Sequence, residues 1–115
     1  MKRAGQVAIL RFPNVDLAPG KPRPVLLLAS LPGPYDDWLV CMISTQLRHE
    51  IAGFDEIIDA NADDFELAGI KVPSVIRIAR LAIVASELLP GSIGEIAPDR
   101  LDKIRNKLGY WLQGG

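Results

Sequence analysis

Strand-like segments fill most of this chain ahead of a single helical pattern, and this order constrains the fold more than any other feature. Short apolar or β-branched runs are separated by turns rich in proline, glycine and aspartate. The runs cover residues 6–12, 25–29, 38–45, 56–59, 74–85 and 92–96. The lack of a regular alternation of strands with helices argues against a doubly wound α/β fold. We expect a mainly β protein: a small, strongly bent, barrel-like antiparallel sheet with one helix packed on it.

The helical pattern begins at Pro98, which suits the first position of a helix, and Asp99 suits the positive end of the helix dipole. Apolar residues then recur three and four positions apart, as expected for one buried face: Leu101, Ile104, Leu108 and Trp111. The two glycines at positions 114 and 115 are expected to end the helix. The sequence therefore predicts a C-terminal amphipathic helix.

The size and composition indicate one domain, residues 1–115, held together by a hydrophobic core. Cys41 is the only cysteine, which excludes an internal disulfide framework and a cysteine-based zinc site, and it reads as a small core residue. One histidine and one cysteine leave no plausible transition-metal site, so no metal or cofactor is expected. No run reaches the roughly 18 apolar residues of a membrane span. A reducing cytoplasm suits such a chain.

The net charge of −1 hides a strong segregation along the chain. Residues 1–24 hold five basic groups against one acid, and residues 71–115 hold seven against four. Residues 25–70 hold one basic group against nine acids. A general nucleic-acid binder is not indicated, but basic surfaces from both ends of the chain have the charge to contact phosphates. Ordinary solvated surface charge is the alternative.

Arg23 lies between Pro22 and Pro24, directly before a buried strand. Each proline fixes its own φ and disfavours the helical region in the residue before it, so Arg23 is held on stiff, extended backbone. A guanidinium presented in this way suits a phosphate, since its planar fork of donors keeps its charge. The alternative is a surface arginine at a strand entrance.

Ser44 and Thr45 end the expected third strand, and His49, the only imidazole, follows it. Side chains alternate across a strand, so only one of the two hydroxyls faces a given site, where it would donate to a phosphate oxygen. His49 is within reach of a cleft as a general base. The alternatives are polar residues at a strand end and a lone surface histidine.

Taken together, these segments resemble the PemK/MazF family, the toxins of bacterial toxin–antitoxin pairs. The likeness covers nearly the whole chain in order, and its most specific piece is an Arg-Pro motif. The stretches that carry it are 5–7 with 12–13, 21–28, 41–45, 68–77 and 93–96.

The resemblance implies a compact SH3-like barrel with a C-terminal helix, forming a homodimer. It implies a growth-inhibiting, metal-independent and sequence-specific endoribonuclease, which cuts single-stranded RNA and leaves a cyclic phosphate and a 5′-OH. The family's catalytic arginine corresponds to Arg23. Its strand-end hydroxyl corresponds to Ser44 by spacing and to Thr45 by chemical type, so both stay candidates. We expect Arg23 to supply charge and to be a candidate for the acid.

Further RNA contacts are expected from the residues around this pair: Phe12, Asp16, Lys21, His49 and Arg77. Loop 13–22 adjoins Arg23 and should help to choose the RNA sequence. Splayed bases of single-stranded RNA usually stack on aromatic side chains, for which Phe12, Tyr35 and Trp38 are candidates. For Arg77 an ordinary ion pair within a strand is the alternative.

One departure from the family concerns the general base. Some members carry an Arg-x-Asp pair on the later strand, but here Arg77 is followed by Ile78 and Ala79. Either Asp16 or His49 takes over as base, or the activity is weak or absent. A non-enzymatic toxin that binds gyrase, as in the CcdB family, is therefore an alternative reading, as is an inactive member that only docks its antitoxin.

The expected partners are single-stranded RNA and an antitoxin with an acidic, disordered tail. The tail would cover the basic surface near Arg23, Arg77 and Lys71 and block RNA entry. No membrane is expected as a partner, and the expected location is the bacterial cytoplasm.

Overall fold

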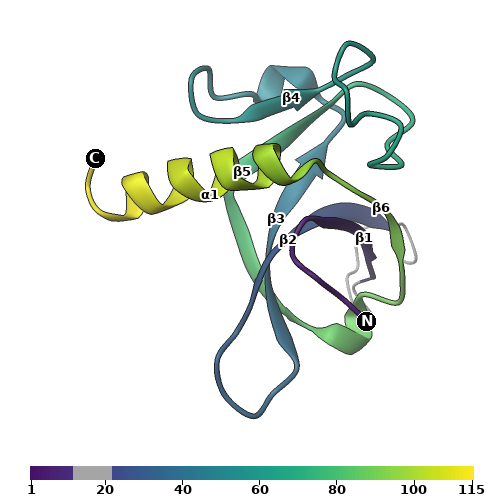
Figure 1. Ribbon diagram of the computed structural model, residues 1–115, viewed down its shortest axis with the longest axis vertical. Helices are drawn as coiled ribbons and strands as arrows, with labels where there is room; N and C mark the ends of the chain where they lie inside the picture. The colour runs from purple at the N-terminus through teal and green to yellow at the C-terminus, as the bar shows by residue number, and fades with distance from the viewer. Residues whose placement is uncertain (12–21) are drawn as a thin grey trace.

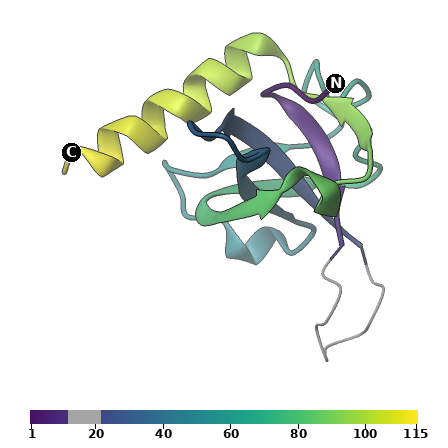
Figure 2. The same ribbon diagram turned by 90° about the horizontal axis from the view of Figure 1, so that it is seen from below.

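Six antiparallel strands form one curled sheet in the computed structural model, which describes residues 1–11 and 22–115. The strands are β1 (Gln6–Leu10), β2 (Arg23–Ser30), β3 (Asp37–Ser44), β4 (Glu56–Ile58), β5 (Ser74–Ala85) and β6 (Ser92–Glu95), in the order β4-β5-β3-β2-β1-β6. Two short 3₁₀ turns, η1 (Leu47–His49) and η2 (Ser86–Leu88), precede the C-terminal helix α1 (Pro98–Leu112). The sheet curls into a half-barrel with α1 across one side (Figures 1 and 2). This confirms the predicted mainly β fold with a C-terminal helix.

The sheet separates two apolar clusters, as expected from strands that are buried on both faces. One cluster lies under α1 and contains Leu26, Cys41, Ile76 and the helix residues Ile104 and Leu108. The other lies inside the curl, on the opposite face, and contains the alternate strand residues: Ala8, Leu10, Val25, Leu27, Trp38, Val40, Val84 and Leu89. The unbroken apolar run that starts at Val25 is therefore buried from both sides, as predicted.

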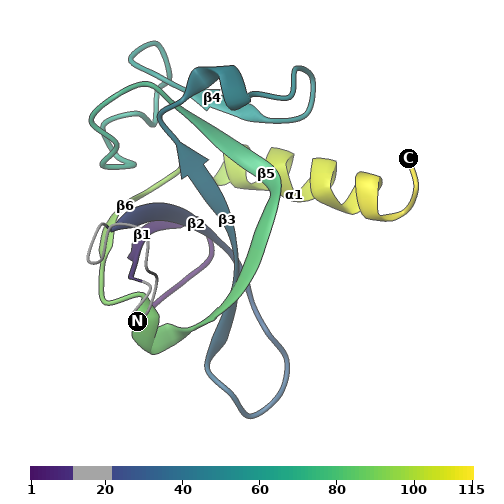
Figure 3. The ribbon, with the colours of Figure 1, turned by 180° about the vertical axis from the view of Figure 1, so that it is seen from behind.

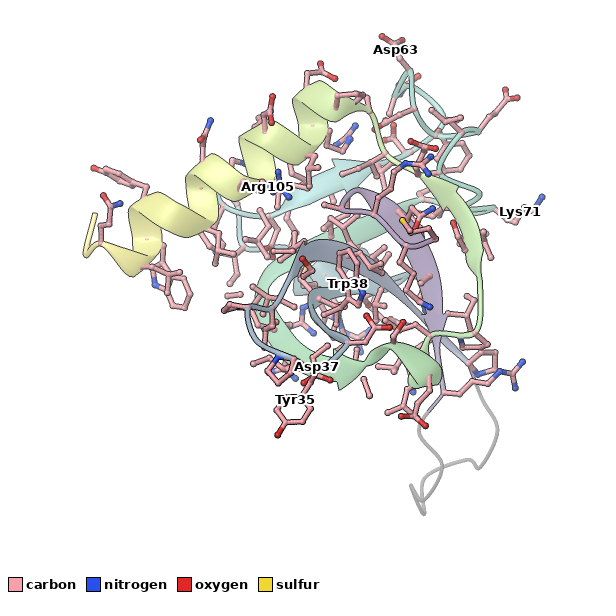
Figure 4. All side chains as sticks on the ribbon, turned by 60° about the horizontal axis from the view of Figure 1, so that its bottom comes forward. Tyr35, Asp37, Trp38, Asp63, Lys71 and Arg105 are labelled. Atoms are coloured by element: carbon pink, nitrogen blue, oxygen red, sulfur yellow. The ribbon has the colours of Figure 1, made fainter. Side chains whose placement is uncertain are left out.

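Two irregularities let the sheet curl. Between β2 and β3 the register shifts at Leu28, and between β3 and β5 it shifts where Cys41 pairs with Leu81 but Met42 pairs with Arg77. Residues 78–80 are thus extra residues on β5, and such insertions bend the bulged strand. The carbonyl of Leu28 accepts hydrogen bonds from the Arg105 guanidinium beneath α1, at 2.7 and 3.3 Å (Figure 4).

Two glycines let distant backbone segments touch beside the sheet edge. A Cβ atom on Gly69 would lie 2.1 Å from the Ile93 carbonyl oxygen, and one on Gly94 would lie 2.2 Å from the Leu67 carbonyl oxygen. Gly69 also has a φ of +74°, which favours glycine. The amide of Glu95 donates to the Leu67 carbonyl at 3.0 Å, so this contact ties β6 to the segment before β5.

A buried ion-pair network attaches α1 to the loop and strand beneath it. Arg100 binds both oxygens of Asp64 at 2.8 and 3.1 Å, and it reaches Glu56 at 3.0 Å. Lys103 and Lys107 pair with the second oxygen of Glu56. Asp64 also accepts the Ala97 amide at 3.0 Å, which satisfies a donor at the helix start that has no side-chain cap of its own.

Three element ends differ from the sequence prediction. β2 begins at Arg23 and not at Val25, because Arg23 and Pro24 pair with β1. The ladder to β3 begins only at Val25, so Pro24 needs no N–H for a hydrogen bond on that side. β3 ends at Ser44 and leaves Thr45 outside the strand. Trp111, predicted on the buried helix face, is 46% exposed, because α1 extends past the sheet (Figure 2); its ring meets that of Phe54 edge-on.

We predict that Arg100→Leu lowers the free energy of unfolding by about 3–5 kcal/mol, because it leaves Asp64 as a buried carboxylate without a counter-charge. Urea unfolding measures this. Arg3→Leu is the matched control: it breaks the Arg3–Glu95 pair, whose arginine is 62% exposed, and should cost at most about 1 kcal/mol. Equal losses in the two variants would contradict the structural role given to the network.

The same network predicts a sensitivity to acid. Burial alone would raise the pKa of Asp64, but the hydrogen bonds from Arg100 and the Ala97 amide outweigh it and hold that pKa below 3.8. The stability gained from Asp64 is therefore complete above pH 3.8 and lost as the pH falls through the lower folded pKa. Acid unfolding of the parent and of Arg100→Leu checks this. The variant should lack the loss of stability that the parent shows as the pH falls through the folded pKa of Asp64.

Candidate active site

Arg23 and Ser44 both belong to the open end of the β2–β3 hairpin, where β2 begins and β3 ends. The β2–β3 ladder ends at the pair Val25–Met42. Arg23 lies two residues before Val25 and Ser44 two residues after Met42, so each points to the same face as its strand neighbour. Directly opposite residues of an antiparallel pair share a face of the sheet. Both side chains thus belong to the face that carries Val25 and Met42, which is the face away from α1.

Arg77 joins this face from β5. Arg77 pairs with Met42, and Ser44 pairs with Val75, so Arg77 and Ser44 are diagonal neighbours on one face. The Cα atoms of such neighbours are roughly 7–8 Å apart. The face formed by β3 and β5 is turned to the viewer in Figure 3, with α1 behind it. Three adjacent strands therefore contribute Arg23, Ser44 and Arg77 to one surface.

Asp55 fixes the bend of β5 beside this surface. Its carboxylate is buried, and its two oxygens accept the amides of Ile78, in the bulge, at 3.0 Å and of Ile51 at 2.9 Å. The carboxylate thereby ties the bulge that follows Arg77 to the turn that follows η1. Asp55 is a positioning residue that the sequence analysis missed, because an aspartate in an acidic stretch gives no sign of burial.

Ser44 and His49 are in direct contact. Ser44 Oγ lies 3.1 Å from His49 Nδ1 and accepts the Gln46 amide at 3.0 Å. The Gln46 side chain in turn accepts a hydrogen bond from Arg48 at 2.8 Å. The turn after β3 therefore folds back so that the only imidazole stands beside the strand-end hydroxyl.

The surroundings of His49 favour its neutral form. Desolvation, followed by the positive charges of Arg77, Arg48 and Arg80, lowers the pKa of His49 from the ordinary 6.5. Arg48 and Arg80 were not singled out in the sequence. Arg80 lies in the bulge of β5, so strand alternation alone does not indicate that it acts on His49.

The other sequence candidates divide into three groups. Thr45 is exposed and outside β3, so of the two hydroxyls only Ser44 contacts His49. Trp38 is buried inside the curl and Tyr35 lies in the hairpin turn, about 25 Å along the strand from Ser44, so neither stacks bases at this site (Figure 4). Phe12, Asp16, Lys21 and all but the last residue of loop 13–22 lie outside the described residues.

In the described part of the chain, the site around Ser44 and His49 contains no thiol and no metal centre. Cys41 is buried in the core, as predicted, and burial, with the charge of Asp55 as the second cause, raises its pKa to about 12, so the thiol stays protonated. Within residues 1–11 and 22–115, no group of three or more His, Cys, Asp or Glu side chains is arranged to hold a metal ion. In the same residues no helix is long and apolar enough to cross a membrane.

We predict that Asp55→Asn costs about 1–3 kcal/mol of unfolding free energy, because the new NH₂ group faces an amide and leaves it unpaired. Asp59→Asn is the matched control, since Asp59 accepts only the exposed Asn61 amide, and it should stay within about 0.5 kcal/mol of the parent. Urea unfolding gives both values. Indistinguishable midpoints for the two variants would rule out Asp55 as a brace of β5.

Two solved structures share the fold of this chain. The chain superposes on a chain of the MazE–MazF structure (Form-II) of Deinococcus radiodurans with a TM-score of 0.68 at 21% identity, covering 96% of this chain and 94% of that one. The toxin MazF-mt6 of Mycobacterium tuberculosis gives a TM-score of 0.67 at 19% identity, with coverage of 94% and 96%. At such identities the likeness establishes the fold. No curated protein sequence matches significantly.

The sequence itself matches a family of known description. A model of the PemK-like, MazF-like toxins of type II toxin–antitoxin systems matches residues 3–112, nearly the whole chain. The resemblance seen in the sequence motifs is thereby confirmed. The chain belongs to the PemK/MazF-like toxin family.

Proposed function

We propose that this toxin is a metal-independent, sequence-specific endoribonuclease that cuts single-stranded RNA and thereby inhibits growth. The observation that carries the proposal is the shared sheet face of Arg23, Ser44 and Arg77, with Ser44 in contact with His49. A hydroxyl donor among cations suits one phosphodiester, because such groups stabilise the charge that develops at its oxygens.

The reaction uses the 2′-OH of the RNA as nucleophile. The O2′ atom attacks the adjacent phosphorus, the P–O5′ bond breaks, and a cyclic phosphate and a 5′-OH result. The chain must supply a base for the 2′-OH, a proton for O5′ and charge for the pentavalent oxyanion. In our proposal, Arg23 supplies charge and the proton for O5′, Ser44 donates to a phosphate oxygen, and Arg77 binds phosphate.

Ser44 is preferred to Thr45 as the donor. Its Oγ contacts His49 and the Gln46 amide, whereas Thr45 is exposed beyond the end of β3. A hydroxyl held by two partners is preorganised, and preorganisation is what gives a donor its catalytic value.

We predict that Arg23→Ala lowers cleavage roughly a hundredfold or more, since one such donor is typically worth about 2.7–4 kcal/mol. Ser44→Ala should lose activity on the same scale and Thr45→Ala clearly less. Initial rates on one long RNA measure all three, with Arg3→Ala as a control for removing one exposed charge. Full activity in Arg23→Ala would show that Arg23 is not catalytic, and a larger loss in Thr45→Ala would exchange the two hydroxyls.

The function itself is tested by incubating the pure protein with a long single-stranded RNA in EDTA. Discrete fragments that end in cyclic phosphate and begin with 5′-OH are expected. Cleavage that needs added metal would contradict the metal-independent mechanism. Intact RNA together with stalled gyrase would instead identify a gyrase-binding toxin, and intact RNA alone a family member without catalysis.

The proposed partners follow the family. The MazE–MazF structure pairs a toxin of this fold with MazE, which supports an antitoxin partner for this chain. We propose an antitoxin with an acidic, disordered tail that covers the face of Arg23 and Arg77 and extends toward Lys71, because opposite charge guides such an encounter. We further propose a homodimer that acts in the bacterial cytoplasm. Phe12, Asp16 and Lys21 remain proposed RNA contacts.

A further inference from the structure

The only histidine of the chain has a hydrogen-bonding role linked to that of Ser44. We propose that His49 is the general base of the proposed ribonuclease, held by Ser44 in the tautomer whose Nε2 lone pair accepts the proton of the RNA 2′-OH. This inference rests on the proposed function. It names a general base for a chain that has Ala79 at the position where some family members carry an aspartate.

A serine hydroxyl makes a limited number of hydrogen bonds. It donates one and accepts two. Ser44 Oγ already accepts the Gln46 amide at 3.0 Å, and its second neighbour is His49 Nδ1 at 3.1 Å. If Ser44 donates its hydrogen to Nδ1, none is left for a phosphate. If Nδ1–H donates to Oγ instead, the hydroxyl hydrogen is free for the phosphate.

The two roles therefore depend on each other. A Ser44 hydroxyl that donates to the phosphate requires the proton of neutral His49 to sit on Nδ1, and this leaves Nε2 without a proton. When Nε2 takes the 2′-OH proton, Nδ1–H still donates to Ser44 Oγ, so the contact survives the step. The hydroxyl that donates to the phosphate therefore also orients the imidazole. This matches nucleophile–base pairs in general, in which a third group orients the base.

The charges around His49 keep it available as a base. Ser44 faces it from β3, Arg48 from η1, and Arg77 and Arg80 from β5, and the causes of its lowered pKa include no carboxylate of the described residues. A pKa below 6.5 means that the neutral form predominates at neutral pH. A bound phosphodiester adds negative charge beside these arginines and stabilises the imidazolium that forms during the step.

Protons and bonds balance in this scheme. Nε2 of His49 takes the 2′-OH proton, the O2′–P bond forms and the P–O5′ bond breaks. The departing O5′ takes a proton from Arg23, which regains one from solvent, while His49 releases its proton to solvent. No water is consumed and no metal or oxidant is needed, so the products are the cyclic phosphate and the 5′-OH.

Nuclear magnetic resonance tests the tautomer independently of activity, because isotope-labelled histidine gives one imidazole signal set in a chain with one histidine. The probe is a random-sequence pool of 2′-deoxy oligonucleotides, which bind but lack the nucleophile. At neutral pH with the pool bound, we expect a protonated Nδ1 and a lone pair on Nε2. Ser44→Ala should lose this preference and Thr45→Ala should keep it. A protonated Nε2 in the bound parent would overturn the assignment.

Kinetics test the base role. His49→Gln should lower kcat roughly a hundredfold or more, the usual minimum for a general base, with little change in KM. In the parent, the rate should rise with pH through the pKa of His49 measured by titration. Arg80→Gln should raise that pKa and move the acid limb of the rate profile to higher pH by the same amount. Arg3→Gln, far from the site, should move neither.

The outcomes separate the two proposals. Cleavage by the parent with an acid limb that does not follow the His49 pKa would overturn His49 as base and point to Asp16, while the ribonuclease stands. A parent that does not cut RNA would overturn the proposed function and the base role with it, whatever tautomer the spectra show.

Discussion

The brace between Asp55 and the bulge of β5 is the constraint on which the other features depend. Three extra residues on β5 break its register with β3, and the buried carboxylate ties the break to the turn after η1 by accepting the amides of Ile78 and Ile51. The bend is one of the two irregularities that let the sheet curl. It also carries Arg77 and Arg80 toward the turn that holds His49, so fold and candidate site share one cause.

The curled sheet also separates the charges of the chain. On the α1 side, the acidic middle segment is neutralised by the helix, since Arg100, Lys103 and Lys107 take up Asp64 and Glu56. On the opposite face, no ion pair within residues 1–11 and 22–115 engages Arg23, Arg77 or Arg80. A chain with a net charge of −1 thus presents a cationic face, and the proposed RNA path and antitoxin contact lie there.

The site could be predicted only in part because its residues are related by pairing rather than by sequence spacing. Arg23 was recognisable from its two prolines, and the strand-end hydroxyls from their position. The choice of Ser44 over Thr45 needed the β3 terminus and the contact with His49. Asp55, Arg48 and Arg80 carried no pattern, because burial and a bulge become visible only when strands pair.

The sequence by itself determined the mainly β class, the order of the strands along the chain, the helix start at Pro98, the core role of Cys41 and the family. These depend on local periodicity and turn chemistry, which act over a few residues. Only the tertiary structure decided which side chains share a face, where β5 bends and why Trp111 is exposed. Those features arise from register and from the length of α1 relative to the sheet, which are set by contacts between residues far apart in the chain.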